Sequence, residues 1–246
     1  MTISIDYDRL YAMAEARREA FKAAQPFPHA VIDDLFDAQT YAAISGCFPS
    51  PSSSIWKKPE NEHTQGKYVT RRGDSDLKER LFDEAARRVF FELNSSLFLR
   101  FLSILSGISG LVPDPYFAEA GFHCSESGGH LDIHADFSHH DQTGLERRLN
   151  LLFYLNEGWG ADYGGELSLY DADLRPIRSI APIANRCVVF ETSDTSYHGH
   201  PTPLRLPEGV YRKSIALYYY SLPTGRGVSR IVFPSDRAFT PDVTPG

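Results

Sequence analysis

Seven short strand-like segments follow one another between residues 116 and 233, and no helical period interrupts them. Each segment is rich in Val, Ile, Tyr or Phe, and Gly, Asp or Pro separates it from the next, which is typical of strands joined by turns. The expected strands are residues 116–124, 129–136, 148–156, 166–170, 177–180, 186–191 and 212–221. Consecutive strands without crossover helices favour a sandwich or jelly-roll barrel over a parallel sheet.

The first 115 residues have a different pattern. Apolar residues at helical spacing predict helices over residues 7–24, 38–47 and 76–106, the last with a break at 94–96. A short strand is expected at 29–32, and the polar segment 48–77 predicts a long lid loop. The fold class is therefore mainly β with helical support (α+β).

We expect one domain over residues 1–246. It consists of N-terminal helices, a strand and the lid loop (1–115), a β core (116–233) and a C-terminal tail (234–246). A hydrophobic content of 42% is enough to bury a sizeable core in a chain of this length.

Composition narrows the classes of partner. The chain has 25 basic and 32 acidic residues, a formal charge of −7, so nucleic acid is not an expected partner. No run approaches the ~18 apolar residues of a membrane span, and the N-terminus lacks a basic, apolar leader. Cys47, Cys124 and Cys187 are too widely spaced for a disulfide framework or a zinc ribbon. We expect reduced thiols, no membrane and a cytoplasmic location.

Histidine and aspartate cluster in residues 128–141, GGHLDIHADFSHHD. Three His-x-Asp triplets occur there, whereas random placement predicts about 0.7 for the whole chain. In a strand, residues i and i+2 project to the same face, so one triplet can offer an imidazole and a carboxylate to one metal ion. The triplets are His130 with Asp132, His134 with Asp136, and His139 with Asp141.

A third metal ligand is available in the histidine-rich turn expected at 196–201, which contains His198 and His200. Two imidazoles and one carboxylate on one face of an octahedron leave three positions open, as in non-haem Fe(II) oxygenases. One site uses only two of the six clustered histidines, so the others are hydrogen-bonded strand or turn residues. The residues alone do not decide which triplet is used.

An anion pocket is expected beside the metal. Alternation along residues 212–220 places Arg212 and Ser214 on one face. A buried guanidinium requires an anion, and its planar fork of donors matches the two oxygens of a carboxylate. Tyr154 shares a face with Asn150 on another expected strand and can add a phenol donor.

The order of these motifs resembles the Fe(II)- and 2-oxoglutarate-dependent dioxygenases of the prolyl 4-hydroxylase-like group. The second triplet is followed by RRLNLLFYLNEGW, YGGELSLYD, NRCVVFETSDTSYHGHP and RKSIALYYYS, and PFPHAVIDDLFD resembles the first strand of the group. The likeness covers residues 116–222 and implies a double-stranded β-helix (jelly-roll) core. It departs from the family in a Pro-rich insertion, PTPLRLPEG, between the distal His and the Arg.

The resemblance implies a role for each matching residue. The iron ligands would be His134, Asp136 and His198, because the spacing in the family selects the second triplet. Arg212 would clamp the distal carboxylate of 2-oxoglutarate with help from Tyr154 and Ser214, and Leu167 would pack on the carbon chain of the co-substrate. The family often has a Tyr that contacts the co-substrate near Phe122 or His123, and this sequence lacks it.

The implied activity is hydroxylation of an unactivated C–H bond, coupled to conversion of 2-oxoglutarate to succinate and CO2. The implied cofactors are Fe(II) and 2-oxoglutarate, with ascorbate as reductant, and the partners are dioxygen and a prolyl, amino-acid, peptide or polar-metabolite substrate. Two alternatives use the same residues. One is a cupin-like jelly roll that binds a metal or sugar, and the other is a zinc-dependent isomerase or hydrolase.

Overall fold

A computed structural model of the chain describes residues 3–57, 68–70, 80–114, 116–117 and 120–223. Most of the expected lid loop and the whole expected tail (234–246) lie outside the described residues. Within the described part, antiparallel sheets dominate and helices pack against one of them. This confirms the mainly β fold with helical support.

In the described part of the chain, eight strands form the larger sheet. Its order is β1 (His29–Ile32), β10 (Cys187–Glu191), β7 (Glu146–Tyr154), β12 (Arg212–Ser221), β5 (Gly121–Ser125), β3 (Tyr68–Thr70) and β2 (Trp56–Lys57), while β4 (Val112–Pro113) pairs with β12 off this path. Neighbouring strands pair antiparallel. The long central strands β7 and β12 therefore present one face to the helices and the other to the smaller sheet.

The smaller sheet has the order β6 (Leu131–His134), β11 (His198–His200), β8 (Leu167–Tyr170) and β9 (Pro176–Ile180) among the described residues. The expected histidine-rich turn is wrong, because its histidines form β11, which pairs with β6 and β8. A Cβ on Gly199 would lie 2.8 Å from the backbone oxygens of Leu131 and Asp132, so β11 and β6 approach too closely for any other residue. A three-residue His-Gly-His strand has no alternation that a sequence pattern could detect.

Each described α-helix begins after a side chain that caps its first turn by accepting a hydrogen bond from the backbone N–H three residues later. The helices and their caps are α1 (Tyr7–Ala23) with Asp6, α2 (Ala38–Ser45) with Asp37, α3 (Glu84–Leu93) with Asp83, and α4 (Ser96–Ser106) with Ser95. None of these helices alone is long and apolar enough to cross a membrane, although α3 and α4, bent by 41°, pass that test as a pair by length and composition.

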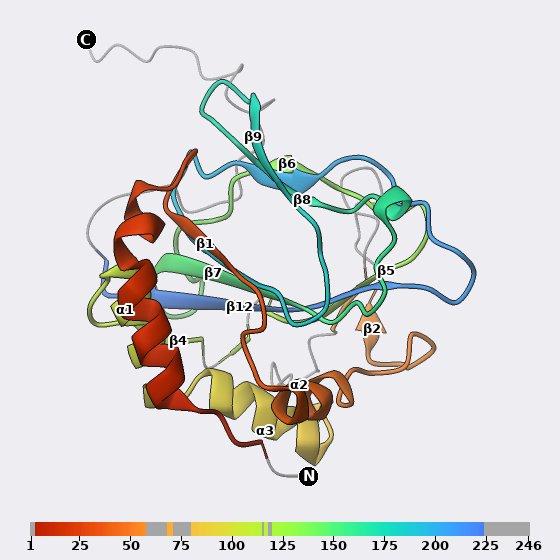
Figure 1. The fold of residues 1–246 in the computed structure, drawn as a ribbon, viewed down its shortest axis with the longest axis horizontal. Coiled ribbons are helices and arrows are strands. Elements are labelled where there is room, and N and C mark those ends of the chain that lie inside the picture. Colours follow the sequence, from red (N-terminus) through yellow and green to blue (C-terminus); the bar gives the residue numbers. More distant parts are fainter. Residues whose placement is uncertain (1–2, 58–67, 71–79, 115, 118–119, 224–246) are drawn as a thin grey trace.

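Two main apolar cores of the described residues separate the layers that Figure 1 shows, with the smaller sheet above, the larger sheet across the middle, α2 and α3 below and α1 at the left. The larger core lies between the helices and the larger sheet, where Phe98 of α4 and Leu151 of β7 are fully buried. The smaller core lies between the two sheets and joins Tyr154 of β7 to Leu169 of β8. The fold thus buries one face of β7 against helices and the other against the second sheet.

The polar segment 48–77 is not entirely loop. Trp56 pairs with Thr70 and Lys57 with Val69, and β3 then adds to the edge of β5. The expectation of a continuous loop is therefore wrong for these five residues. Their pairing depends on the backbone donors and acceptors of β5, which a local sequence pattern does not reveal.

The three cysteines are free thiols, as the sequence predicts. Burial raises the pKa of Cys124 to about 12, despite the opposing charge of Lys213. Its thiol therefore stays protonated, and a protonated thiol is a poor nucleophile.

The aromatic cluster under the larger sheet generates a stability prediction. Phe90 of α3 is fully buried, stacks on Phe82 at 4.6 Å and packs edge-on against Phe122 at 5.1 Å. We expect Phe90→Ala to lower the free energy of unfolding by about 3–5 kcal/mol, because it leaves a cavity that the rings around it do not fill. Phe91→Ala on the same helix removes a ring that is 59% exposed and should change stability by less than about 0.5 kcal/mol. Urea unfolding measures both, and equal effects would contradict this packing.

Candidate functional site

The smaller sheet brings three possible metal ligands together. His134 ends β6 and His198 begins β11, and the two are direct partners across the strands with ring centroids 4.5 Å apart. Asp136 follows His134 by two residues, and the nearest ligand atoms of the three side chains all lie within 4.8 Å of one another. Of the three His-x-Asp triplets, the second is the one that lies beside His198. All three residues are buried.

The hydrogen bonds of the two imidazoles fix which ring nitrogen faces the third ligand. Nδ1 of His134 lies 2.8 Å from the carbonyl of Asp132, and Nδ1 of His198 lies 3.0 Å from the carbonyl of Ser196. A carbonyl only accepts, so each Nδ1 carries the proton, and each Nε2 of the neutral ring offers a lone pair. These Nε2 atoms lie 3.7 Å and 3.5 Å from the carboxylate oxygens of Asp136.

This donor set fits a divalent transition metal. Two imidazole nitrogens and a carboxylate oxygen are the ligands of an open, three-residue iron site, and backbone carbonyls that hold the far ring nitrogens are usual around such ligands. The residues present could therefore hold Fe(II) with coordination positions left for other molecules.

Two residues that the sequence analysis did not select hold Asp136 in place. Arg147 on β7 lies 3.1 Å from its Oδ2, and the amide of Asn150 donates a short hydrogen bond to the same oxygen. Arg147 also donates to Asn150 Oδ1 at 2.7 Å. Its guanidinium is buried and lies 3.5 Å from the ring centroid of Tyr218. The Asp136 carboxylate is thus fixed by the guanidinium of Arg147 and the amide of Asn150, and these two groups are also hydrogen-bonded to each other.

A bulge explains why Arg147 was missed. The pairing of β7 with β12 shifts between Tyr219 and Tyr220, so that Tyr219 lies opposite Leu149 and Tyr220 opposite Arg147. Strict alternation from Tyr154 and Asn150 would turn Arg147 to the other face of the sheet. The extra residue in β7 returns it to the metal side. Only Asn150, which shares the Tyr154 face, could have been found from the sequence pattern.

The electrostatic surroundings keep Asp136 ionised. Burial alone would raise its pKa, but the positive charge of Arg147, the two imidazoles and the hydrogen bond from Asn150 outweigh burial and lower the pKa below its usual range. A carboxylate that stays ionised at neutral pH is the form that ligates a metal.

A second group of predicted residues forms a polar row across the larger sheet. Ser214 of β12 lies opposite Tyr154 of β7 on one side and His123 of β5 on the other. Directly opposed residues share a face, so all three point toward the smaller sheet. Phe122 points the other way, into the helix-side core. Of the two positions considered for the missing family tyrosine, His123 is therefore the one that faces the pocket.

Arg212 lies two residues before Ser214 on the same face and is buried. Its Nε donates to the carbonyl of Gly165 at 2.8 Å, and a terminal nitrogen donates to the Tyr154 hydroxyl at 3.3 Å. Leu167, fully buried, packs with Tyr154 in the core between the sheets. The predicted pocket residues thus converge around one guanidinium.

Gly165 allows this arrangement. It has a φ of +76°, and a Cβ there would lie 2.4 Å from Leu204 and 3.0 Å from the Arg212 side chain. Any larger residue would displace the guanidinium from its present position.

The remaining clustered histidines lie outside the three-ligand group among the described residues. His140 is buried against the carboxylate of Asp114 at 3.1 Å, and its other ring nitrogen lies 3.1 Å from the backbone N–H of Gln142. Nδ1 of His139 contacts the Ser138 hydroxyl at 3.0 Å. His139 and His140 thus stabilise the turn after Asp136.

A protein with an open His-Asp-His group of candidate metal ligands, in a fold of two antiparallel sheets, is the class that this geometry defines. Comparison with known proteins specifies it further. Residues 120–220 match the model of the 2OG-Fe(II) oxygenase superfamily. The chain is 30% identical over 202 residues to prolyl 3-hydroxylase OGFOD1 of Mus musculus, which covers 79% of this chain but 33% of that protein. The chain thus spans about a third of the length of that curated relative.

Solved structures show the same fold. A prolyl hydroxylase from Trichoplax adhaerens, in complex with a hypoxia inducible factor peptide, superposes with a TM-score of 0.61 at 18% identity, covering 87% of this chain and 90% of that one. A prolyl-4-hydroxylase from Pseudomonas putida gives 0.57 at 17% identity, covering 85% and 99%. Residues 120–220 of this chain thus resemble the 2OG-Fe(II) oxygenase superfamily, and the chain has the fold of the solved prolyl hydroxylases. Fe(II) and 2-oxoglutarate are the cofactors of that family.

The contact of Arg147 with Asp136 leads to a prediction for the metal-free protein. Arg147→Met should lower the free energy of unfolding by about 3–5 kcal/mol, because it leaves a buried carboxylate without its cation. Adding Mn(II) under anaerobic conditions should reduce this deficit, since the ion supplies positive charge beside Asp136. Urea unfolding with and without the ion measures both effects.

Arg148→Met is the matched control. Arg148 is partly exposed and lies 3.5 Å from Glu191, so its loss should lower stability by about 1 kcal/mol or less. A deficit in Arg147→Met that is as small as that of the control, or that Mn(II) leaves unchanged, would contradict the role given to Arg147.

Proposed function

We propose that His134, Asp136 and His198 hold Fe(II) in this chain and that the chain hydroxylates an unactivated C–H bond of a prolyl residue in a peptide. The convergence of these three side chains, in a chain whose residues 120–220 match the oxygenase family, carries the proposal. When bound, Fe(II) would supply the redox chemistry that couples oxidation of the substrate by dioxygen to the conversion of 2-oxoglutarate to succinate and CO2.

The residues around the metal have separate tasks. The carbonyls of Asp132 and Ser196 orient the two imidazoles. Arg147 and Asn150 keep the Asp136 carboxylate ionised and restrict its rotation. Fixed side chains would keep the three donor atoms in one arrangement. This would favour binding of the co-substrate and would disfavour loss of the metal.

Arg212 binds the distal carboxylate of 2-oxoglutarate in this proposal. Its buried guanidinium already has Gly165 and Tyr154 as partners, and its remaining donors suit a carboxylate. The Tyr154 and Ser214 hydroxyls can donate to the same carboxylate, and Leu167 packs on the carbon chain. His123 takes the place of the family tyrosine in this row.

The substrate class rests on the relatives. A prolyl 3-hydroxylase and two prolyl hydroxylases are among the similar proteins, which favours a prolyl peptide over a free amino acid or a polar metabolite. We propose further that the two facing sheets form a double-stranded β-helix, that ascorbate serves as reductant, and that the protein works in the cytoplasm without nucleic acid or membrane partners. Mass spectrometry for the gain of one oxygen on prolyl peptides tests the substrate.

The alternatives explain less. A cupin-like binding protein accounts for the sheets and the histidines but not for the buried Arg212 pocket or the family match. A zinc isomerase or hydrolase accounts for the three ligands but gives Arg212 no anion to bind. Anaerobic titration with Fe(II) and 2-oxoglutarate distinguishes the three, because only the oxygenase forms the weak visible absorption band of the metal chelate with the keto acid.

Substitution of the ligands tests the metal site. We expect His134→Ala, Asp136→Ala and His198→Ala each to abolish Fe(II)-dependent conversion of 2-oxoglutarate to succinate, because two remaining ligands hold the ion weakly. His139→Ala, outside the three-ligand group, should keep most of the turnover. Full turnover in any of the first three variants would remove that residue from the site.

Substitution of Arg212 tests the co-substrate pocket. Arg212→Ala should leave Fe(II) affinity nearly unchanged and weaken 2-oxoglutarate binding by about tenfold or more, the effect of losing one charge-assisted hydrogen bond. Arg212→Lys should recover only part of this, because an ammonium does not present two parallel donors. The chelate band at fixed Fe(II) gives the affinities. Wild-type affinity in Arg212→Ala would mean that another residue binds the anion.

A further inference from the structure

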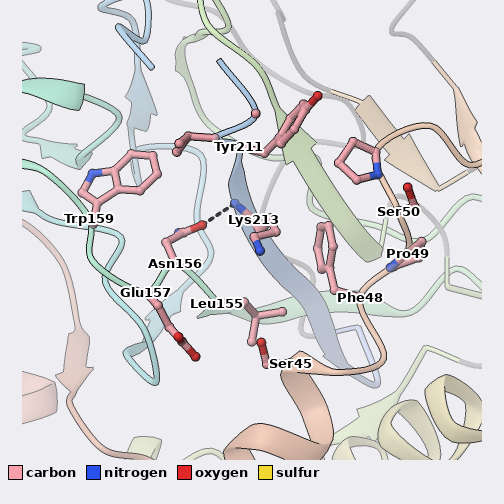
Figure 2. A pocket seen from close by; sticks show the side chains of 13 residues that line it. Ser45, Phe48, Pro49, Ser50, Leu155, Asn156, Glu157, Trp159, Tyr211 and Lys213 are labelled. Atoms are coloured by element: carbon pink, nitrogen blue, oxygen red, sulfur yellow. Dashed lines mark hydrogen bonds between the residues drawn. The ribbon is translucent and has the colours of Figure 1, made fainter. Parts of the chain in front are cut away.

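A second cavity of about 570 Å³ lies on the helix side of the larger sheet. The end of α2, the turn after it, the residues that follow β7 and the start of β12 surround it (Figure 2). None of the proposed ligands of Fe(II) or 2-oxoglutarate lines this cavity. It is therefore separate from the site described above.

The pleat of β12 explains the separation. Arg212 and Lys213 are consecutive residues of this strand, so their side chains leave opposite faces of the sheet. Arg212 points toward the smaller sheet, where it meets Tyr154 and Gly165. Lys213 points into the second cavity (Figure 2).

Lys213 is held firmly by its backbone. Its N–H donates to the side-chain oxygen of Asn156 at 2.6 Å, as the dashed line in Figure 2 shows, and its carbonyl accepts from the N–H of Leu155 at 3.2 Å. Asn156 is itself fixed, since its amide donates to the carbonyl of Pro182 at 2.6 Å. The lysine stem therefore starts from a rigid point in the cavity wall.

The ammonium of Lys213 lies near the aromatic ring of Phe48 and forms no ion pair with the described residues. It lies 5.7 Å from the centroid of Phe48, and no acidic group among the described residues lies within ion-pair distance of it. A half-buried ammonium beside apolar side chains attracts an anion more strongly than one in open water, because the local dielectric constant is lower.

The walls of the cavity combine polar and apolar side chains. Phe48, Leu155, Trp159 and Tyr211 surround the lysine (Figure 2). The indole N–H of Trp159 is already engaged with the carbonyl of Gly164 at 3.2 Å, so the residue offers the cavity its ring rather than a donor. A ligand would meet one cation, the rings of Phe48, Trp159 and Tyr211, and hydroxyl groups of Ser45 and Ser50.

We propose that this cavity is a second ligand site, which takes a small monocarboxylate with an aromatic or apolar body. One ammonium balances one negative charge, and Glu157 at the rim disfavours a second, so a phosphate ester or a dicarboxylate fits less well. The volume is within the range of cavities that enclose small organic ligands. The proposal does not depend on the oxygenase function.

The two tryptophans of the chain report directly on this site. Trp159 lines the cavity, and Trp56 contacts Phe48 with ring centroids 5.5 Å apart. We expect 3-phenylpropionate to change the tryptophan fluorescence of the full chain in a saturable way, and isothermal titration to give the same affinity. The uncharged 3-phenylpropanamide should bind about tenfold more weakly or worse, because it lacks the carboxylate.

Three variants locate the binding. Lys213→Met keeps the apolar stem and should lose about tenfold or more in affinity for 3-phenylpropionate. Lys22→Met removes an exposed positive charge elsewhere and should bind as wild type. Arg212→Met should also bind 3-phenylpropionate as wild type, because its side chain is on the other side of the sheet.

Two results with Lys213→Met and the wild-type chain would overturn the proposal, and a third concerns Arg212→Met. One is wild-type affinity in Lys213→Met. The other is the absence of saturable 3-phenylpropionate binding by the wild-type chain up to ~10 mM, because a dissociation constant above that concentration means negligible binding. Loss of binding in Arg212→Met alone would assign the probe to the co-substrate pocket and would also overturn it. A circular dichroism spectrum of each variant that matches wild type establishes that the fold is intact.

Discussion

The ion pair between Asp136 and Arg147 is the interaction on which the rest of the site depends. A carboxylate buried between two sheets needs a positive charge beside it, and β7 provides one that also bonds to Asn150. This arrangement keeps Asp136 ionised and fixed before any metal binds. His134 and His198, aligned across β6 and β11, complete the group of candidate ligands.

The anion pocket depends on strand pairing in the same way. Adjacent strands place His123, Ser214 and Tyr154 in one row. The first and the last of these residues in the sequence, His123 and Ser214, are more than 90 residues apart. Arg212 extends this row, and Gly165, in the turn before β8 of the opposite sheet, provides the carbonyl that accepts from its guanidinium. The candidate metal ligands and the Arg212 pocket thus both lie between the two sheets, as the proposed reaction between metal and co-substrate requires.

Strand β12 links the two candidate ligand sites. Its first residue, Arg212, serves the pocket between the sheets, and the next residue, Lys213, serves the cavity on the helix side. Asn156 fixes the backbone at this point by accepting from Lys213 and donating to Pro182. A ligand at either site therefore meets a strand whose position the surrounding hydrogen bonds already restrain.

Sequence by itself determined the local part of this protein: its helices and most of its strands, the His-x-Asp motif, and the shared face of Arg212 and Ser214. These follow from periodicity, capping and the two-residue repeat of a strand, which act over a few residues. Contacts between distant segments decided the rest. They select the triplet beside His198, return Arg147 to the metal side through a bulge, turn His123 rather than Phe122 toward the pocket, and form the cavity around Lys213. Each of these depends on the register between strands, which long-range pairing sets and no local pattern encodes.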